Sequence, residues 1–257
     1  MLLQNAIVQE NYNSKNLVEI WGGLIGWKKR REGENGFLVN QLRKHNVHKV
    51  FDAALGDGCD SIYLIQQGFD VTSNEVDKAF LAKALQNAKA NNVQLKFTSL
   101  DWRELDKELE AKSFDAVIIL GNSLTYLFTK ESQMKSLEQF RRILKRGGIL
   151  IIDERNYQNI LDNRDEILKG NFNYSGKYIY CGEKVHGRPV EISDARVKFE
   201  YTDEVTNKKA HLIMYPWKRG ELKNLLQKTG FESVEQYSNY LPEENPDADF
   251  YQYVCIK

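Results

Sequence analysis

Short apolar runs alternate with segments of helical periodicity across residues 36–153. The apolar runs, each typical of a buried strand, occupy residues 50–55, 69–73, 94–100, 113–121 and 149–153. Apolar side chains recur at helical spacing over residues 36–46, 61–65, 77–92 and 131–145, the last expected to end at Arg146-Gly147-Gly148. Such alternation predicts a parallel sheet with right-handed crossovers, and therefore an α/β fold.

The pattern changes in the last third of the chain. Helical periodicity is lost over residues 171–216, where three stretches alternate between apolar and polar side chains, at 178–180, 197–201 and 210–215. These stretches predict an antiparallel β subdomain inserted into the order of the sheet. A helix and two closing strands are expected to follow, over residues 218–229, 231–238 and 250–256.

The first strand runs directly into a glycine-rich turn. Gly56 and Gly58 follow the apolar run, and a helical pattern opens at Ser61. Glycine allows a tight turn and a close approach of the backbone to a ligand, which the free N–H groups of the following helix then face. Glu75 ends the second strand about 20 residues after Gly56, the offset expected for an acid that binds ribose hydroxyls. Together these features predict a nucleoside ligand.

The charge around this turn narrows the ligand class. A third glycine of the dinucleotide pattern is missing, since Asp60-Ser61 stand in its place, and Asp52 lies inside the strand just before the turn. A carboxylate so close repels a pyrophosphate but suits a ligand with a positive charge. The pattern favours S-adenosylmethionine over a dinucleotide. The alternative from these residues alone is a plain strand–turn–helix of another α/β protein.

Polar side chains also end the other expected strands. Asp101-Trp102 follows the third strand and could bind and stack on an adenine, although Trp102 could equally pack at the sheet edge. Gly121-Asn122-Ser123 follows the fourth strand, and the run from Asp153 to Tyr157 follows the fifth. Open α/β sheets bind their ligands at these carboxyl ends, so the polar runs mark one candidate site.

Composition excludes several classes of function. The 36 lysines and arginines balance 36 aspartates and glutamates, so no nucleic acid or membrane surface is expected as the main partner. The chain lacks a signal-peptide pattern and any apolar run long enough to span a membrane, so a cytoplasmic location is expected. The three cysteines and four histidines are scattered, which argues against a disulfide framework and against a metal site.

Four runs of residues carry a resemblance to a known family. They are Asp60-Ser61-Ile62, the stretch 68–73, Gly121-Asn122-Ser123 and the stretch 153–157. On these runs the chain resembles glycine N-methyltransferase and the glycine/sarcosine N-methyltransferases of bacteria and archaea along nearly its whole length. The resemblance implies the Rossmann-like fold of class I methyltransferases, a seven-stranded sheet with an inserted antiparallel β subdomain and an N-terminal lid.

The resemblance and the pattern together predict four parts of the chain. They are an N-terminal arm or lid over residues 1–35, an S-adenosylmethionine-binding α/β core over 36–157, an inserted substrate subdomain over 158–216, and a C-terminal helix with closing strands over 217–257. Oligomeric state cannot be read from the sequence, since the family ranges from monomers to tetramers.

The resemblance implies two sets of site residues. The positions matching contacts to the cofactor are Tyr12, Trp21, Arg31, Ala53, Gly56, Gly58, Glu75, Asp101, Trp102, Leu120 and Tyr126. The positions matching the acceptor and methyl-transfer site are Asn122, Arg155, Tyr201 and Tyr215, with Arg155 as the arginine that binds the substrate carboxylate.

The chain departs from the family at three of the matched positions. Glu75 stands where the family more often has aspartate, and Tyr126 stands where it usually has histidine. Cys181 falls about where a site tyrosine is expected, with Tyr178 and Tyr180 as neighbours. The departure at Tyr126 concerns the affinity for the cofactor, and the departure at Cys181 concerns the identity of the acceptor.

The implied function is S-adenosylmethionine-dependent N-methylation of glycine, sarcosine or both, an early step toward betaine. Methyl transfer from an activated sulfonium needs mainly proximity and orientation, so no metal is expected, and the proton is expected to leave to water. Two alternatives remain open. One is a methyltransferase of another small amine, and the other is a regulatory protein that binds the cofactor with little turnover.

Overall fold

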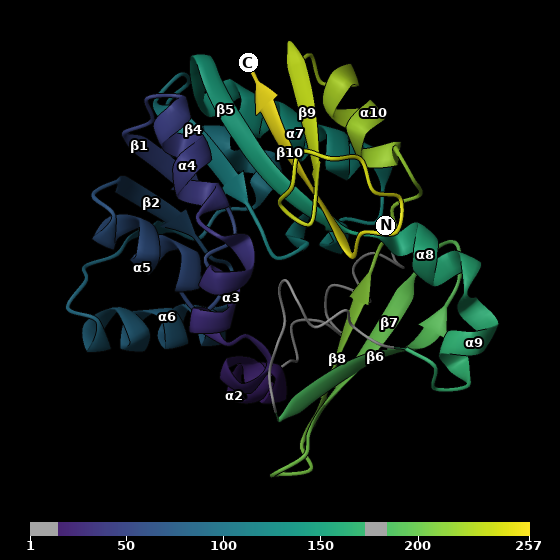
Figure 1. Ribbon diagram of the computed structural model, residues 1–257. Helices are drawn as coiled ribbons and strands as arrows, with labels where there is room; N and C mark the ends of the chain where they lie inside the picture. The colour runs from purple at the N-terminus through teal and green to yellow at the C-terminus, as the bar shows by residue number, and fades with distance from the viewer. Residues whose placement is uncertain (1–14, 173–183) are drawn as a thin grey trace.

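The computed structural model describes residues 15–172 and 184–257 of the 257-residue chain. Its main feature is a seven-stranded sheet in the order β3-β2-β1-β4-β5-β10-β9 (Figure 1). The strands are β1 Lys49–Asp52, β2 Asp70–Asn74, β3 Lys96–Thr98, β4 Phe114–Ile119, β5 Leu144–Arg155, β9 Ser233–Ser238 and β10 Phe250–Ile256. Strands β1 to β5 are parallel, whereas β10 pairs antiparallel with both β5 and β9. The predicted fold class is confirmed.

Helices cover both faces of this sheet because neighbouring strand residues point to opposite sides. Val117 and Leu150 pack with α7 Lys130–Ile143 and α10 Glu221–Lys228 on one face. Ala116 and Ile149 pack with α4 Phe37–Lys44 and α5 Cys59–Gln66 on the other. All four side chains are fully buried. Each buried Val, Leu or Ile side chain among them stabilises the fold by roughly 1.5–3 kcal/mol.

The remaining helices surround the carboxyl ends of the parallel strands. They are α2 Lys15–Leu24, α3 Trp27–Glu34, α6 Lys78–Ala90, α8 Tyr157–Asp162, α9 Arg164–Leu168 and the 3-10 helices η1 Trp102–Lys107 and η2 Ser123–Tyr126. Helix α6 begins where Asp77 accepts hydrogen bonds from the N–H groups of Ala79 and Phe80, at 2.7 and 3.1 Å. Helices α8 and α9 were not predicted from the sequence.

A separate antiparallel sheet lies beside the main one (Figure 1). It consists of β6 Val185–Ile192, β7 Val197–Asp203 and β8 Lys209–Met214. Two of these strands match expected ones, whereas β6 was missed, and the strand expected over 178–180 lies outside the described residues. Helix α2 packs closely on this sheet, because a Cβ at Gly23 would lie 2.8 Å from Cγ2 of Val185.

The predicted end of the helix before β5 was wrong. Helix α7 ends at Ile143, and β5 begins at Leu144, so Gly147 and Gly148 lie inside the strand. The pairing of β5 with β4 shifts in register here, and Gly147 has a φ of 72°. A Cβ at Gly148 would lie 2.9 Å from the carbonyl oxygen of Asp115. The two glycines therefore allow a bulge against β4 rather than a helix cap.

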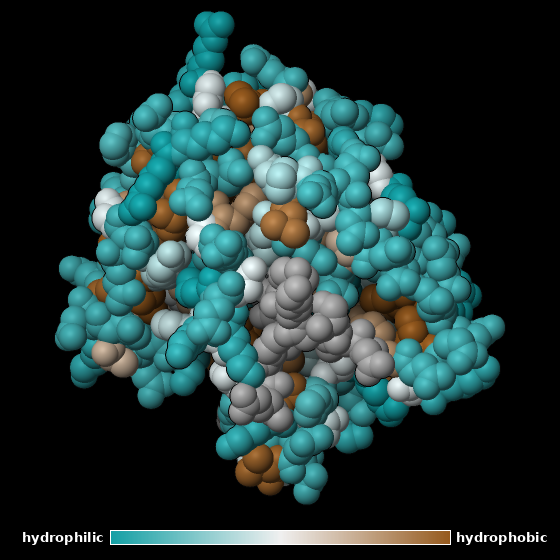
Figure 2. Space-filling view, in the orientation of Figure 1, coloured by the Kyte–Doolittle hydropathy of each residue, from teal (hydrophilic) through white to brown (hydrophobic). Residues whose placement is uncertain are grey.

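The exposed surface in the view of Figure 2 is mostly hydrophilic, with hydrophobic residues in small separate patches. The large apolar side chains that remain exposed are Val76, Leu85, Phe97, Leu168, Val205 and Leu241. Within residues 15–172 and 184–257, no helix combines the length and the apolar character needed to cross a bilayer.

Candidate functional site

The glycine turn after β1 is joined to the end of β2 by Glu75. Its carboxylate accepts one hydrogen bond from the N–H of Gly56 and another from the N–H of Asp77, both at 2.9 Å. Gly56 has a φ of 55°, a conformation that glycine adopts without strain. Burial raises the pKa of Glu75 to about 7. At neutral pH about half of the Glu75 carboxyl groups are therefore ionised, and the ionised form can accept hydrogen bonds from hydroxyl groups.

Asp52 lies beneath the glycine turn rather than beside the space above it. It is 2% exposed and accepts hydrogen bonds from Oγ of Ser61 at 2.6 Å and from the N–H of Ala54 at 3.1 Å. The Ser61 hydroxyl also lies 2.8 Å from Oγ of Ser73. Burial raises the pKa of Asp52 to about 7. Asp52 therefore fixes the turn from below, which differs from the ligand-facing role that the sequence suggested.

A central cavity of about 370 Å³ opens above the carboxyl ends of β1, β2 and β4. Eight of the predicted cofactor residues line it, namely Trp21, Ala53, Gly56, Glu75, Asp101, Trp102, Leu120 and Tyr126. They come from α2, from the turns after four strands and from η2, so the fold gathers residues from over a hundred positions of sequence. Whether each contacts the cofactor stays a prediction.

Two aromatic side chains shape the walls of this cavity. The indole N–H of Trp102 donates to the carbonyl oxygen of Ala53 at 2.7 Å, which fixes the ring against the end of β1. Across the cavity, Trp21 of α2 and Phe80 of α6 meet edge to face, with ring centroids 5.1 Å apart. This second pair joins α2 to α6, and both rings line the cavity.

Asp101 is held by Arg103. Its carboxylate accepts hydrogen bonds from the backbone N–H and from Nε of Arg103 at 2.9 and 2.8 Å, and it also pairs with Nη2. These hydrogen bonds from Arg103 lower the pKa of Asp101, although partial burial opposes them. The half-exposed carboxylate is thus ionised and fixed in orientation at the cavity wall.

Helix α3 presents two adjacent arginines to Asp60, but only one of them reaches the cavity. Arg30 is 5% exposed, lines the cavity and binds Asp60 through Nη2 at 2.8 Å. Arg31 also pairs with Asp60, but it binds Glu34 at 2.7 Å and lies 4.6 Å over the ring of Tyr63, outside the cavity lining. Although burial opposes it, the two guanidinium groups hold the pKa of Asp60 below its usual value.

The remaining predicted cofactor positions lie elsewhere. Gly58 precedes α5 with a φ of 92°, and a Cβ there would lie 3.0 Å from Cδ1 of Ile62, so this glycine serves packing beneath the turn. Tyr12 falls outside the described residues, as do Cys181, Tyr178 and Tyr180.

Asn122 joins β4 to β5 from a left-handed conformation, with a φ of 63°. Its N–H donates to Asp153 at 2.6 Å, its Nδ2 donates to Oη of Tyr157 at 2.6 Å, and its Oδ1 accepts from the N–H of Arg155 at 3.1 Å. The residue is 3% exposed. In this conformation the amide orders the strand ends rather than facing open space.

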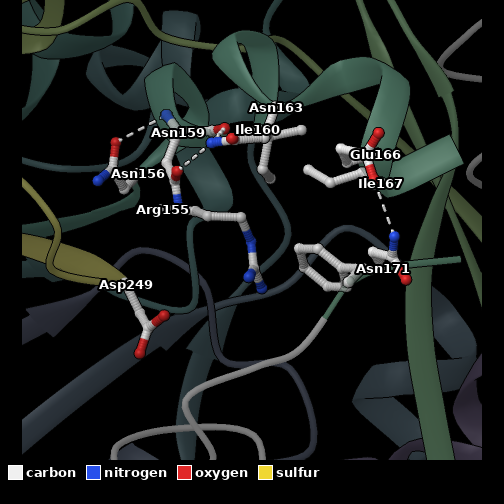
Figure 3. Close-up of a pocket in the computed structure, with 10 residues that line it drawn as sticks. Arg155, Asn156, Asn159, Ile160, Asn163, Glu166, Ile167, Asn171 and Asp249 are labelled. Atoms are coloured by element: carbon white, nitrogen blue, oxygen red, sulfur yellow. Dashed lines mark hydrogen bonds between the residues drawn. The ribbon is translucent and has the colours of Figure 1, made fainter. Parts of the chain in front are cut away.

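A second, smaller cavity of about 190 Å³ lies at the carboxyl end of β5 (Figure 3). Arg155 enters it, with Cζ 4.6 Å from the ring centroid of Phe250 and 5.0 Å from that of Phe199. The other lining residues are Asn156, Asn159, Ile160, Asn163, Glu166, Ile167, Asn171, Phe172 and Asp249. A buried cation among amide groups and aromatic rings suits a small carboxylate.

The two predicted tyrosines lie outside both cavity linings. Tyr201 is buried in β7 and stacks on Phe199, with ring centroids 6.1 Å apart. Tyr215 donates its hydroxyl to Glu221 at 2.8 Å and packs against Trp217. The four predicted acceptor residues therefore do not share one cavity in this structure.

A thin layer of side chains separates the two cavities. The hydroxyl of Tyr157 lies 3.2 Å from Sδ of Met214, and Nδ2 of Asn122 lies 3.4 Å from the same sulfur. The neighbours of Asn122 in sequence, Gly121 and Ser123, line the central cavity, whereas Arg155, to which Asn122 is bonded, lines the second. The cavities are thus adjacent sites joined by one hydrogen-bonded group.

Charge in the central cavity favours a ligand with a positive centre. Its acidic lining residues are Asp57, Asp60, Glu75, Asp77 and Asp101, and among the described residues its cationic ones are Arg30 and Arg103. No group of three or more histidine, cysteine, aspartate or glutamate side chains within the described ranges is arranged to hold a metal ion. Glu75 lies at the sequence offset expected for an acid that binds ribose hydroxyls, and the indole of Trp102 lines the cavity. Together with the acidic lining, these features fit S-adenosylmethionine.

Several cavity residues were missed by sequence reasoning. Asp77 could have been found, because its position as a helix cap places it directly after Glu75. Arg30, Phe80 and Leu212 carry no such signal, since they reach the cavity from a helix face or from the second sheet.

Comparison with known proteins agrees with this site. Residues 50–148 match the family model described as a methyltransferase domain. The chain is 37% identical over 251 residues to the glycine/sarcosine N-methyltransferase of Aphanothece halophytica, covering 96% of this chain and 91% of that protein. It is 34% identical over 244 residues to that of Parasynechococcus marenigrum, covering 95% and 83%.

A solved structure shows the same fold. The structure of an S-adenosylmethionine-dependent methyltransferase from Clostridium acetobutylicum aligns with a TM-score of 0.70 at 15% identity, covering 94% of this chain and 97% of that one. Sequence, fold and cavity chemistry thus agree. The chain belongs to the glycine/sarcosine N-methyltransferase family of S-adenosylmethionine-dependent methyltransferases.

Proposed function

We propose that the protein transfers methyl groups from S-adenosylmethionine to the amine nitrogen of glycine, sarcosine or both. The observation that carries this proposal is the guanidinium of Arg155 in a small polar cavity beside the central one (Figure 3). A guanidinium forms paired hydrogen bonds with a carboxylate, which both glycine and sarcosine possess. The names of the relatives, glycine/sarcosine N-methyltransferases, support the same class of acceptor.

The central cavity would hold the cofactor. S-adenosylmethionine supplies a methyl group on a positively charged sulfur, which is already activated for transfer. Glu75 would accept hydrogen bonds from the ribose, Asp101 and Trp102 would border the adenine, and Arg30 would face the carboxylate of the methionine part. The Trp21–Phe80 pair would keep water away from the reacting groups.

The acceptor side works by orientation. Arg155 would bind the acceptor's carboxylate and so limit where its amine can lie. Its own position is fixed by Phe199 and Phe250 on either side and by the bond of its N–H to Asn122. Asn122 connects the two cavities, and its amide oxygen would reach an amine only by turning away from the N–H of Arg155. The amine's proton would leave to water.

The test is methyl transfer from labelled S-adenosylmethionine to glycine, sarcosine and dimethylglycine, each assayed separately. Turnover on glycine and sarcosine but not on dimethylglycine would establish the proposed activity. Turnover on dimethylglycine as well would extend it to a third methylation. If none of the three is methylated while the cofactor still binds, the proposal is wrong, and another small amine or a regulatory role takes its place.

A further inference from the structure

Three charged side chains line the second cavity, and they come from three different segments. Arg155 ends β5, Glu166 belongs to α9, and Asp249 immediately precedes β10. Glu166 accepts hydrogen bonds from Nζ of Lys169 at 2.7 Å and from Nδ2 of Asn171 at 2.9 Å, and its side chain is 57% exposed, so it lies at the solvent-facing end of the cavity. Asp249 lies at the other end, beside Arg155.

The antiparallel pairing of β10 with β5 sets Asp249 next to Arg155. Phe250 is the direct partner of Arg155 in the ladder, and its ring lies under the guanidinium. The carbonyl oxygen of Asp249 accepts a hydrogen bond from the N–H of Asn156 at 2.8 Å, which fixes its backbone. Figure 3 shows the side chains of Arg155 and Asp249 extending to the same side of the helical segment that carries Asn156.

Of these three charges, the cation of Arg155 and the nearby anion of Asp249 together match the charge pattern of a free amino acid. Glycine and sarcosine are zwitterions in water at neutral pH, with a carboxylate and an ammonium group two bonds apart. The cavity volume of about 190 Å³ is about six times the ~30 Å³ that a water molecule occupies in the liquid. A guanidinium alone would accept any small carboxylate, whereas an added carboxylate disfavours simple anions.

We propose that Asp249 is a specificity-determining residue that binds the ammonium group of the incoming amino acid while Arg155 binds its carboxylate. The inference rests on the proposed function for the identity of the acceptor. Asp249 selects the zwitterion over simple anions when the acceptor enters, before the amine loses its proton and turns toward the central cavity. Its contribution is to acceptor binding and not to the chemical step.

The test compares three small ligands on the intact protein. Glycine carries both charges, acetate carries only the anion, and methylammonium carries only the cation. Their dissociation constants are measured by NMR titration for the wild type, Asp249→Asn and Asp247→Asn. Asp247 offers a matched control, since it is an exposed aspartate of the same loop outside the cavity lining.

We expect Asp249→Asn to weaken glycine binding about tenfold, the typical scale for loss of a charge-assisted hydrogen bond. Acetate binding should stay unchanged or tighten, because a repulsive charge is removed. Asp247→Asn should leave both within about twofold, since an exposed charge outside the cavity is screened. The inference is overturned if Asp249→Asn leaves glycine binding unchanged, or if it weakens glycine and acetate equally.

Kinetic measurements give a second readout. The binding measurements separate a failure of the proposed function from a failure of the role assigned to Asp249. If glycine is methylated, Asp249→Asn should raise KM about tenfold with kcat within about twofold, because the lost interaction precedes the chemical step. If the wild type prefers glycine to acetate but methylates none of the acceptors, the proposed function fails and Asp249 keeps its role. If the wild type binds acetate as tightly as glycine, the inference fails whatever the activity.

Discussion

The two cavities are built in contrasting ways. The central one lies over consecutive β–turn–α units, and several of its carboxylates are held by backbone N–H groups, as Glu75 is by Gly56 and Asp77. The second is built mainly from one continuous stretch, residues 155–172, which includes the end of β5, α8 and α9, and strand pairing adds Asp249 from far along the chain. Four of its ten lining residues are asparagines. Under the proposed function, the first would hold a large ligand between fixed turns, and the second would recognise a small one by a few charges.

The contrast teaches where each ligand's affinity is determined. Cofactor binding depends on the spacing of glycines and acids within one β–α–β unit. Proteins with the same fold but different acceptors can therefore share this arrangement. Under the proposed function, acceptor binding would depend on one cation, Arg155, whose surroundings are completed by long-range strand pairing. If the two cavities are independent binding sites, substitutions in one should leave the ligand of the other nearly unaffected, apart from the layer that joins them.

The largest effect is expected at Arg155. Replacing it with Met keeps an unbranched side chain between Phe199 and Phe250 but removes the cation. We expect kcat/KM for glycine and sarcosine to fall by at least about a hundredfold, since a paired charge-assisted contact is lost. The dissociation constant for S-adenosylmethionine, measured by calorimetry, should change by less than about twofold, because Arg155 lies outside the central cavity.

Arg155→Lys is the matched variant, since it keeps the charge but not the planar fork, and we expect intermediate activity. Circular dichroism of both variants checks that the fold is intact. Equal losses of cofactor and acceptor affinity would show that the two cavities act as one site.

The sequence predicted the central cavity better than the second one for physical reasons. Gly56 and Glu75 belong to a single β–α–β unit, where spacing along the chain translates directly into spacing in space. Asp249 and Arg155 line one cavity only because β10 inserts antiparallel beside β5, and no local sequence pattern reveals this pairing. The fold class followed from strand–helix alternation, but α8, α9 and β6 gave no clear periodicity.

The sequence also could not show which way a given side chain points within a helix. Arg30 and Arg31 are adjacent on α3, and successive helix residues point about 100° apart. Resemblance selected Arg31, yet the structure turns Arg30 toward the cavity. The backbone conformation of Gly147 and Gly148 was equally hidden. A glycine pair after a helix is typical of a helix cap, but here it permits a bulge in β5.

The second largest effect separates these two arginines. Arg30→Gln should weaken S-adenosylmethionine binding by about ten- to thirtyfold, because it removes the central-cavity cation that we propose faces the methionine carboxylate. Arg31→Gln should change that affinity by less than about threefold and act instead on stability, since Arg31 binds Asp60 and Glu34 outside the cavity. Calorimetry and thermal unfolding measure the two effects.

Decarboxylated S-adenosylmethionine sharpens this comparison. It lacks the carboxylate, so Arg30→Gln should not weaken its binding if Arg30 acts through that group. An equal loss for both cofactors would assign Arg30 to the packing of α3, and a larger loss in Arg31→Gln would restore the assignment made from resemblance.

A third, smaller effect is the pH dependence of cofactor binding. Burial raises the pKa of Glu75 from 4.5 to about 7, and the ribose hydroxyls and positive sulfur favour its ionised form. S-adenosylmethionine affinity should therefore rise by about three- to tenfold from pH 6 to pH 8, and Glu75→Gln should flatten the profile. Acceptor affinity at Arg155 should show no matching change attributable to Glu75.

In the absence of ligand, the contribution of Glu75 to stability should change with pH in the opposite direction to cofactor affinity. Because folding raises the pKa of Glu75, the folded state binds more protons than the unfolded chain between pH 4.5 and about 7. The contribution of Glu75 to the free energy of unfolding therefore decreases as pH rises across that window. Denaturant titrations of the wild type and Glu75→Gln would reveal it, and identical pH profiles would contradict it.

The smallest effect tests the layer between the cavities. Tyr157→Phe removes the hydroxyl that accepts from Nδ2 of Asn122 and contacts Sδ of Met214. We expect a loss of about 1–2 kcal/mol in the free energy of unfolding, since the buried amide loses its acceptor. Cofactor and acceptor affinities should both shift, each by less than about threefold, because Asn122 is bonded to Arg155 of the second cavity and its neighbours Gly121 and Ser123 line the central one. Calorimetry on both ligands measures this coupling, and a shift confined to one of them would show that the layer belongs to that cavity alone.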